Sequence, residues 1–367
     1  MSLDISKSAV HMNKNTRLKK DKHDDENLDD VDYELVEKFS QNYVPTKGEK
    51  ITFLILGILA LCGFKSIIAS EFAFYPPHII GYTVDEDKFM YGSNHFLQGS
   101  MNKIMEDHGF GINYSKLTKG KDEIAAILLY KKPLDLNKQL ILFSHGNGID
   151  LGYSFHTHLN LLTQTDANVM AYDYSGYGYS NKKPSEKKIY KNIKMVYDYL
   201  TNELEVNPMN IILYGHSIGS CACSYLMTLK NVKVGGCILQ SPLASGIKLI
   251  FPFQKKYIPW LDVFKNYEKL KKASVAPFYI MHGKKDEDVP YHHSIILLNS
   301  LKENFENKRK NKKNKANSSI QNIDNTSLIK FWGVANSDHN NMELMNYDSF
   351  YRRFREFLLH CRHYNSA

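Results

Sequence analysis

Short apolar runs alternate with amphipathic stretches of helical length through most of this 367-residue chain, from Tyr82 onward. Apolar runs of about four to eight residues predict buried strands, and the stretches between them, such as residues 190–204 and 218–230, predict helices. This alternation favours an α/β fold with a mostly parallel central sheet and helices on both faces. The predicted strands are residues 124–130, 140–143, 169–172, 211–214, 234–239, 278–281 and 328–331.

The length suits one large domain, residues 71–367, preceded by extra segments. The net charge of +8 is uneven, because six basic residues lie between Lys308 and Lys315. No basic stripe with a nucleic-acid-binding motif accompanies them, so we expect no nucleic-acid partner. The five cysteines show no spacing typical of disulfides or of a zinc site, which fits a reducing compartment.

Two segments precede the domain. Residues 1–50 mix acidic and basic side chains densely, which predicts a disordered tail. Residues 51–70 are hydrophobic, and as a helix residues 51–69 would be about 28 Å long, close to the hydrocarbon thickness of about 30 Å. Lys65 lies near one end, where its side chain can reach the headgroups. We interpret residues 51–70 as a membrane anchor, either spanning or interfacial, with docking on the domain as the alternative.

The orientation of such an anchor has two interpretations. Basic residues before Ile51 favour a cytosolic N-terminus, so a spanning helix would place the domain across the membrane from the cytosol. The unpaired cysteines instead favour a domain that faces the cytosol. We expect a membrane-associated protein with a cytosol-facing domain.

Two further segments interrupt the alternation. Residues 243–272 form a long crossover rich in aromatic and aliphatic side chains. It predicts a short cap region that either lines an acyl pocket or packs over the sheet. Residues 307–326 are rich in Lys, Asn and Ser, and predict a flexible, basic surface insertion. Its basic run either contacts anionic lipid or is simply solvated.

The sequence ILYGHSIGS contains a G-x-S-x-G motif formed by Gly215, Ser217 and Gly219. An apolar run leads into it and a stretch of small residues follows, which is typical of the strand–turn–helix elbow that exposes a nucleophilic serine. The elbow places Ser217 at a helix N-terminus, where the backbone N–H of Ile218 can face a developing oxyanion. The motif therefore predicts Ser217 as the nucleophile of a serine hydrolase.

A serine nucleophile needs a base, and in this fold an acid and then a histidine follow it, each after a later strand. Asp286 stands in the turn after residues 278–281, with Asp288 as the alternative acid, and His339 stands in the loop after the last predicted strand. Their order predicts a Ser217–His339–Asp286 triad, in which Asp286 orients the imidazole and His339 acts as general base and then general acid.

A second oxyanion donor is expected in the loop after residues 140–143. That loop reads SHGNGIDLG, and either Asn147 or Gly148 would supply the backbone N–H. His145 and Gly146 permit the tight turn before these residues.

Several stretches, taken together and in order, resemble one family. From about Phe72 to about Leu359 the chain is similar to the alpha/beta-hydrolase domain 17 group, which implies an α/β-hydrolase fold. The resemblance also implies a membrane-associated thioesterase that removes palmitate from protein cysteines, with a triad at Ser217, Asp286 and His339. The stretches are FAFYPP, HGNGIDLG, AYDYSGYGYSNKKPSE, ILYGHSIGS, LQSPLASGIKLIFPF, HGKKDEDVP and DHNNMEL.

The chain departs from that group at several positions. His216 stands where Gln is common, and Gly148 stands where Ala is common. The N-terminal cysteine cluster of the group is replaced by the hydrophobic segment 51–70, with only Cys62. The mode of anchoring is therefore open.

We expect a serine hydrolase that cleaves acyl thioesters or esters, with an S-acylated protein as substrate. A lipase or lysophospholipase that acts on acyl lipids would use the same triad and remains the first alternative. A non-catalytic scaffold that has kept the fold is the second. No metal or cofactor is implied.

Overall fold

The computed structural model describes residues 70, 73–85, 88–91, 103–250, 262–315 and 325–366. The predicted tail, residues 1–50, lies outside the described residues, and so does the hydrophobic segment 51–70 apart from Ser70. Within the described ranges, no helix is both long enough and apolar enough to cross a membrane.

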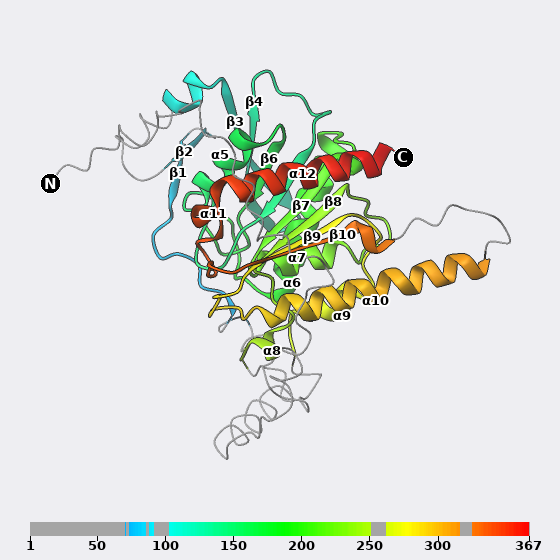
Figure 1. Cartoon of the computed structure of the whole chain (residues 1–367). Helices are drawn as coiled ribbons and strands as arrows, with labels where there is room; N and C mark the ends of the chain where they lie inside the picture. Colours follow the sequence, from blue (N-terminus) through cyan, green and yellow to red (C-terminus); the bar gives the residue numbers. More distant parts are fainter. Residues whose placement is uncertain are drawn as a thin grey trace, which may run out of the picture.

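The domain is built on an eight-stranded sheet with the order β10-β9-β8-β7-β5-β6-β4-β3 (Figure 1). β4 pairs antiparallel with β3 and with β6, and the other pairings are parallel. A separate antiparallel pair, β1 (Tyr82–Asp85) and β2 (Lys88–Tyr91), precedes the sheet. The sheet strands are β3 (Phe110–Lys119), β4 (Asp122–Lys131), β5 (Leu140–Ser144), β6 (Asn168–Tyr172), β7 (Ile211–His216), β8 (Gly236–Gln240), β9 (Phe278–Gly283) and β10 (Ile329–Val334).

Helices cover both faces of the sheet, as the sequence predicts. In Figure 1, α12 lies above β7–β10, and α10 lies below them. Each face has its own buried core, one shared with α6 and α7 and the other with α5 and α12. The main helices are α5 (Phe155–Gln164), α6 (Glu186–Asp198), α7 (Gly219–Leu226), α10 (His292–Lys315), α11 (Met342–Met345) and α12 (Tyr347–Ser366).

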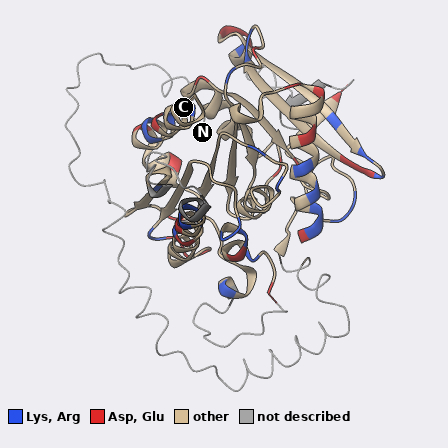
Figure 2. Ribbon diagram, turned by 90° about the vertical axis from the view of Figure 1, so that its right-hand side faces the viewer, with Lys and Arg blue, Asp and Glu red and all other residues tan. Residues whose placement is uncertain are grey.

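The middle of the sheet is apolar because it is enclosed on both sides. Every residue of β5, β6, β8 and β9 is buried. Charged residues are accordingly confined in Figure 2 to the outer helices, the loops and the strands at the edge of the sheet. The predicted α/β architecture is therefore confirmed, with all seven predicted strands present.

The sequence pattern does not predict strand β3, because β3 lies at the edge of the sheet. Its sequence, FGINYSKLTK, mixes polar and apolar residues, and most of its side chains are partly or fully exposed. An edge strand needs no continuous apolar run, so the pattern used for buried strands does not detect it. The predicted helix at residues 190–204 also differs, because α6 ends at Asp198 and a π-helical turn, Tyr199–Glu203, follows.

The prediction of a flexible loop from residue 307 onward is wrong for its first part. α10 continues through Lys315, so residues 307–315 are helical. The part of α10 before the basic run is anchored by buried side chains such as Leu301 and Phe305. Lys and Arg are good helix formers, and no Gly or Pro interrupts the basic run, so the helix can propagate through it. Residues 316–324 lie outside the described residues.

The crossover at residues 243–272 contains two short helices, α8 (Gly246–Ile250) and α9 (Asn266–Leu270). Between them, residues 251–261 lie outside the described part of the chain. Phe264, just before α9, is buried against Phe74, with the two ring centroids 5.8 Å apart. At least this part of the crossover packs on the domain.

Candidate active site

Ser217 lies in the sharp turn between β7 and α7. Its φ of +53° is in the left-handed region, which costs a non-glycine residue free energy. The turn is possible because glycines flank it on both sides. A Cβ on Gly219 would lie 2.1 Å from the backbone oxygen of Ser144, and one on Gly215 would lie 2.6 Å from the oxygen of Gly219. The elbow therefore packs backbone against backbone, which only glycine permits.

Three predicted residues meet at the carboxyl ends of three parallel strands. Nε2 of His339 lies 2.9 Å from Oγ of Ser217, and Nδ1 of His339 lies 2.7 Å from Oδ2 of Asp286. All three side chains are buried. Of the two acids considered, Asp286 makes this contact, whereas Asp288 is exposed. In this arrangement, Nε2 of His339 can take the proton of the Ser217 hydroxyl.

The carboxylate of Asp286 is held from several sides. Its Oδ1 accepts a hydrogen bond from the Val289 N–H at 2.8 Å, and its Oδ2 also lies 3.1 Å from Nε2 of His282. Burial alone would raise the pKa of Asp286, but the hydrogen bonds from His282 and His339 hold it well below its ordinary value. An ionised Asp286 keeps a proton on Nδ1 of His339, so Nε2 is free to accept the serine proton.

His216 also belongs to the site, although its position beside the nucleophile gave no role from sequence. Its ring centroid lies 5.3 Å from that of His339, and its Nε2 lies 3.3 Å from the His339 backbone oxygen. Burial lowers the pKa of His216 to about 4, with a further contribution from His339. His216 is therefore neutral at neutral pH and can donate a hydrogen bond that steadies the His339 loop.

The predicted oxyanion loop lies beside the elbow. A Cβ on Gly146 would lie 2.9 Å from the ring of His216. Of the two candidate donors in the loop, the Gly148 N–H donates to Oδ1 of Asn147 at 3.1 Å. By contrast, the backbone N–H groups of Asn147 and Ile218 donate to no acceptor that belongs to the described residues. These two groups are available to a substrate oxygen.

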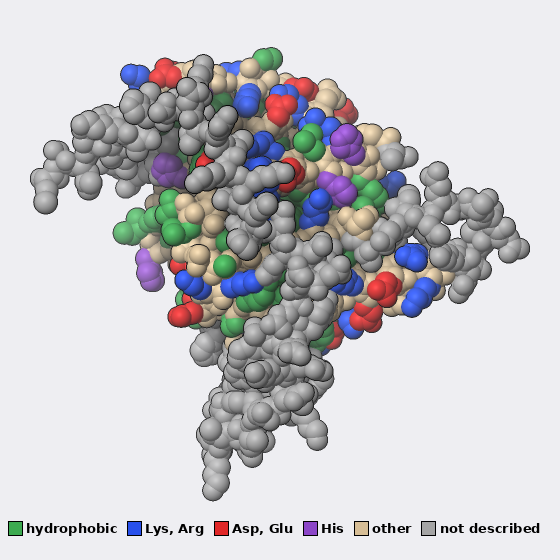
Figure 3. Space-filling view, in the orientation of Figure 1, with side chains coloured by type: hydrophobic (Ala, Val, Ile, Leu, Met, Phe, Trp, Pro, Cys, Tyr) green, Lys and Arg blue, Asp and Glu red, His purple; other side chains and the backbone are tan. Residues whose placement is uncertain are grey.

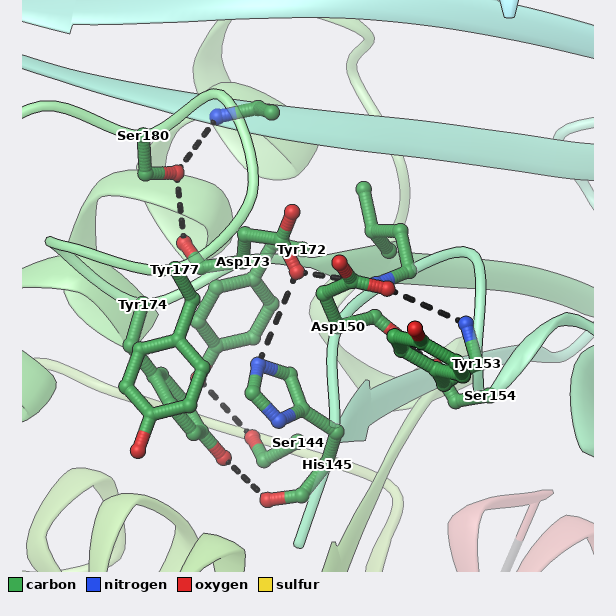
Figure 4. A network of polar contacts seen from close by, with 12 residues as sticks. Ser144, His145, Asp150, Tyr153, Ser154, Tyr172, Asp173, Tyr174, Tyr177 and Ser180 are labelled. Carbon is green, nitrogen blue, oxygen red and sulfur yellow. Dashed lines mark hydrogen bonds and ion pairs between the residues drawn. The ribbon is translucent and has the colours of Figure 1, made fainter. Parts of the chain in front are cut away.

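The loop is held in place by its own side chains and by a buried polar network (Figure 4). Oδ1 of Asn147 accepts hydrogen bonds from the Tyr177 hydroxyl at 2.6 Å and from the Tyr75 N–H at 2.9 Å. Behind the loop, Asp173 accepts a hydrogen bond from the Tyr82 hydroxyl at 2.6 Å and lies 3.7 Å from Nε2 of His145. The sequence gave no sign of this network.

The chain matches known proteins over much of its length. Residues 135–274 match the family model described as serine aminopeptidase, S33, a range that includes Ser217 but ends before Asp286. A curated relative, alpha/beta hydrolase domain-containing protein 17C of Xenopus tropicalis, is 32% identical over 224 residues, which are 61% of this chain and 63% of that protein. Protein 17B of Homo sapiens is 38% identical over 160 residues, which are 44% of this chain and 54% of that protein.

These alignments span less than two thirds of the length of either relative. Among solved structures, the esterase Pf2001 of Pyrococcus furiosus superimposes with a TM-score of 0.54 at 15% identity, over 78% of this chain and 98% of that one. At 15% identity, this superposition shows a shared fold and nothing about function. Together with the sheet order and the elbow, these matches show that the chain has the α/β-hydrolase fold and confirm its resemblance to the alpha/beta hydrolase domain-containing 17 proteins.

Proposed function

We propose that this protein is a membrane-associated serine hydrolase that removes acyl groups from protein cysteines. The observation that supports it most directly is the continuous path of hydrogen bonds from Ser217 through His339 to Asp286, at 2.9 and 2.7 Å. Such a path is the requirement for activating a serine hydroxyl near neutral pH.

In the first half of the proposed reaction, Oγ of Ser217 attacks the thioester carbonyl while Nε2 of His339 takes the hydroxyl proton. The negative charge that develops on the carbonyl oxygen is stabilised by the N–H groups of Asn147 and Ile218. The C–S bond then breaks, and His339 returns the proton to the leaving cysteine sulfur. The products of this half are a free thiol and an acyl ester of Ser217.

In the second half, a water molecule attacks the acyl ester and gives a proton to Nε2 of His339. The bond between the acyl carbon and Oγ of Ser217 breaks, the serine oxygen recovers the proton, and a fatty acid leaves. The same two N–H groups serve both oxyanions. Asp286 stays ionised throughout, because its depressed pKa keeps it from taking the proton from the imidazolium.

The surface around the site suits a long apolar acyl chain delivered from a membrane. Tyr75, whose N–H bonds Asn147, is 57% exposed, and Leu344 and Met345, on α11 just after the His339 loop, are 80% and 61% exposed. In Figure 3 hydrophobic side chains gather at the left edge, on the side where β1 and α11 lie in Figure 1. We propose that residues 51–70 anchor the chain and that this surface lies near the bilayer.

The substrate class is tested by comparing two acyl donors in matched detergent, with Ser217→Ala as the blank. We expect a palmitoylated cysteine peptide to be cleaved with a kcat/KM about tenfold higher than that for a monoacylglycerol of equal chain length. A tenfold ratio corresponds to about 1.4 kcal/mol of differential transition-state binding. If monoacylglycerol or lysophospholipid is preferred by that margin, the protein is a lipase or lysophospholipase, the alternative proposal.

A non-catalytic scaffold would behave differently from both enzymes. A fluorophosphonate probe, which reacts with activated serines, should label the wild-type protein and not Ser217→Ala. Absence of labelling in the folded wild-type protein would favour the scaffold.

A further inference from the structure

The imidazole of His145 makes a hydrogen bond within the oxyanion loop itself. Its Nδ1 lies 2.8 Å from the backbone oxygen of Gly146, the next residue along the chain. We propose that His145 is a positioning residue that orients the Asn147 N–H toward the oxyanion formed at Ser217. The inference rests on the proposed function, since it assigns a cause to the geometry of the oxyanion hole.

The link between the two groups is the planarity of one peptide bond. The Gly146 carbonyl and the Asn147 N–H belong to the same trans peptide unit, so the two groups point in opposite directions. When the His145 ring holds the carbonyl on one side of the loop, the N–H must face the other side. The elbow lies beside this loop, because a Cβ on Gly219 would lie 2.1 Å from the Ser144 oxygen and 2.9 Å from the His145 oxygen.

The ring can hold this carbonyl only if its proton is on Nδ1. Burial lowers the pKa of His145 to about 4, so the imidazole is neutral at neutral pH and carries a single proton. A carbonyl oxygen accepts and cannot donate, which places that proton on Nδ1. On the opposite side, Nε2 makes no hydrogen bond to any described group, and Oδ1 of Asp173 lies 3.7 Å away.

The ring has little freedom to turn away from Gly146. It is almost wholly buried and packs against Tyr174, with ring centroids 4.0 Å apart, and against Tyr177 at 5.3 Å. The hydroxyl of Tyr174 donates to the His145 backbone oxygen at 2.6 Å. Figure 4 shows the ring enclosed by these tyrosines and Asp173. The carbonyl of Gly146 is thus bonded to a group that is itself fixed.

The loop has a second anchor, which acts on a different part of it. The side chain of Asn147 accepts from Tyr75 and Tyr177, and its Nδ2 donates to the Ala73 oxygen at 3.1 Å. These bonds fix where the loop lies. They leave the rotation of the Gly146–Asn147 peptide to the His145 bond.

Two substitutions of His145 with similar polarity distinguish a role in orienting the Gly146–Asn147 peptide from a role in packing. The amide nitrogen of His145→Asn can occupy about the place of Nδ1, whereas the amide of His145→Gln reaches toward the place of Nε2. Both variants should be compared with wild type for thermal unfolding, for kcat and KM on a palmitoyl-peptide thioester, and for inhibition by a trifluoromethyl ketone, which forms an oxyanion on Ser217.

We expect His145→Asn to keep kcat within about fivefold of wild type and His145→Gln to lose at least about tenfold, since removing one oxyanion donor outright costs about 10² to 10³ in kcat. KM should change little in either variant, and the ketone should bind His145→Gln more weakly by the same factor as kcat falls. If His145→Gln does not fold, His145→Leu takes its place with the same expectation.

Equal kcat values in the two variants, or losses confined to KM or to thermal stability, would overturn the assignment of His145. Such a result leaves the proposed function intact as long as wild-type protein is labelled and Ser217→Ala is not. Failure of the wild-type protein to label or to turn over would instead contradict the proposed function.

Discussion

Nε2 of His282 lies 3.1 Å from Oδ2 of Asp286, the same carboxylate oxygen that accepts a hydrogen bond from Nδ1 of His339. The His282 N–H is shared, because Nε2 also lies 2.7 Å from the Val289 oxygen. On the other side of the ring, Nδ1 lies 2.6 Å from the Ser294 hydroxyl, which can donate to it. Asp286 is thus supported by a second histidine, in addition to the one that contacts Ser217.

Replacing His282 should shift the pH profile of the proposed hydrolase activity. In His282→Leu the Asp286 carboxylate loses a donor, so it stabilises the imidazolium form of His339 more strongly. The acid limb of kcat/KM should therefore move to higher pH than in wild type. The measurement is kcat/KM from pH 5 to 9 on a thioester peptide.

The matched control for that experiment is His282→Gln. Its amide nitrogen can still donate toward Asp286, so its acid limb should stay close to that of wild type. His216, whose ring also lies beside that of His339, is unchanged in both variants. An identical profile for His282→Leu and wild type would show that His282 only fills space.

The second prediction concerns the proposed triad of Ser217, His339 and Asp286. Ser217→Ala should remove both fluorophosphonate labelling and turnover while the protein stays folded. His339→Ala should lose nearly as much, because residues of a triad act as a unit, and Asp286→Asn should lose less. Labelling that survives in Ser217→Ala would contradict the assignment of the nucleophile.

Ser217, Asp286 and His339 could be predicted because the fold constrains their order and places each directly after a strand. The strands that lead to Ser217 and Asp286 were detectable because they are buried and begin with an apolar run. Where burial is one-sided, as in β3, or where a basic run continues a packed helix, as in α10, the pattern is no longer diagnostic.

The residues that support the site were beyond sequence reasoning for a different reason. Tyr82 bonds Asp173 across 91 positions of the chain, and His216 contacts the His339 backbone across 123 positions. Neither residue type nor local spacing specifies such partners. For His282 there was a local signal, since it precedes the acid by four residues, but its contact requires the turn that brings Asp286 back.

The third prediction concerns the backbone strain at Ser217, and it can be tested without any substrate. In regular structure, a glycine ordinarily makes the folded protein less stable than an alanine does, by about 0.5–1 kcal/mol. The left-handed conformation, by contrast, costs a residue with a Cβ about 1–2 kcal/mol. Because Ser217 has a φ of +53°, the cost of the left-handed conformation should exceed the usual disadvantage of glycine. Ser217→Gly should therefore be at least as stable as Ser217→Ala in urea unfolding. A glycine variant that is less stable by about 1 kcal/mol would mean that the turn holds no strain.

The proposed anchor makes a fourth prediction. Deleting residues 1–70 should release the domain from pelleted membranes, because the proposed anchor is removed and few large apolar side chains of the described residues are exposed. The comparison is the distribution of full-length and truncated protein after fractionation. Full-length protein that is already free in the supernatant after gentle lysis would mean that residues 51–70 do not anchor it.

The last prediction concerns the stability of the fold against pH and depends on Asp173. Burial raises the pKa of this carboxyl to about 8 from its ordinary value near 3.8, although the hydrogen bond from Tyr82 opposes the rise. Between these two values the folded protein keeps a proton that the unfolded chain has released. The resulting contribution to stability is fully present at pH below about 4 and is lost as pH rises toward 8.

The loss amounts to at most about 1.4 kcal/mol for each pH unit, because one proton is involved. Asp173→Asn cannot ionise, and its amide can still bond Tyr82 and accept from the Leu151 N–H. The free energy of unfolding of Asp173→Asn should therefore increase relative to wild type as pH rises from 5 to 8.

Asp122→Asn is the control. Hydrogen bonds from Lys188 and Lys191 lower the pKa of Asp122, so the effect of this substitution on the free energy of unfolding should be constant from pH 5 to 8. If Asp173→Asn and wild type change in parallel from pH 5 to 8, Asp173 is already ionised in the folded protein, and the assignment of a raised pKa to Asp173 is wrong.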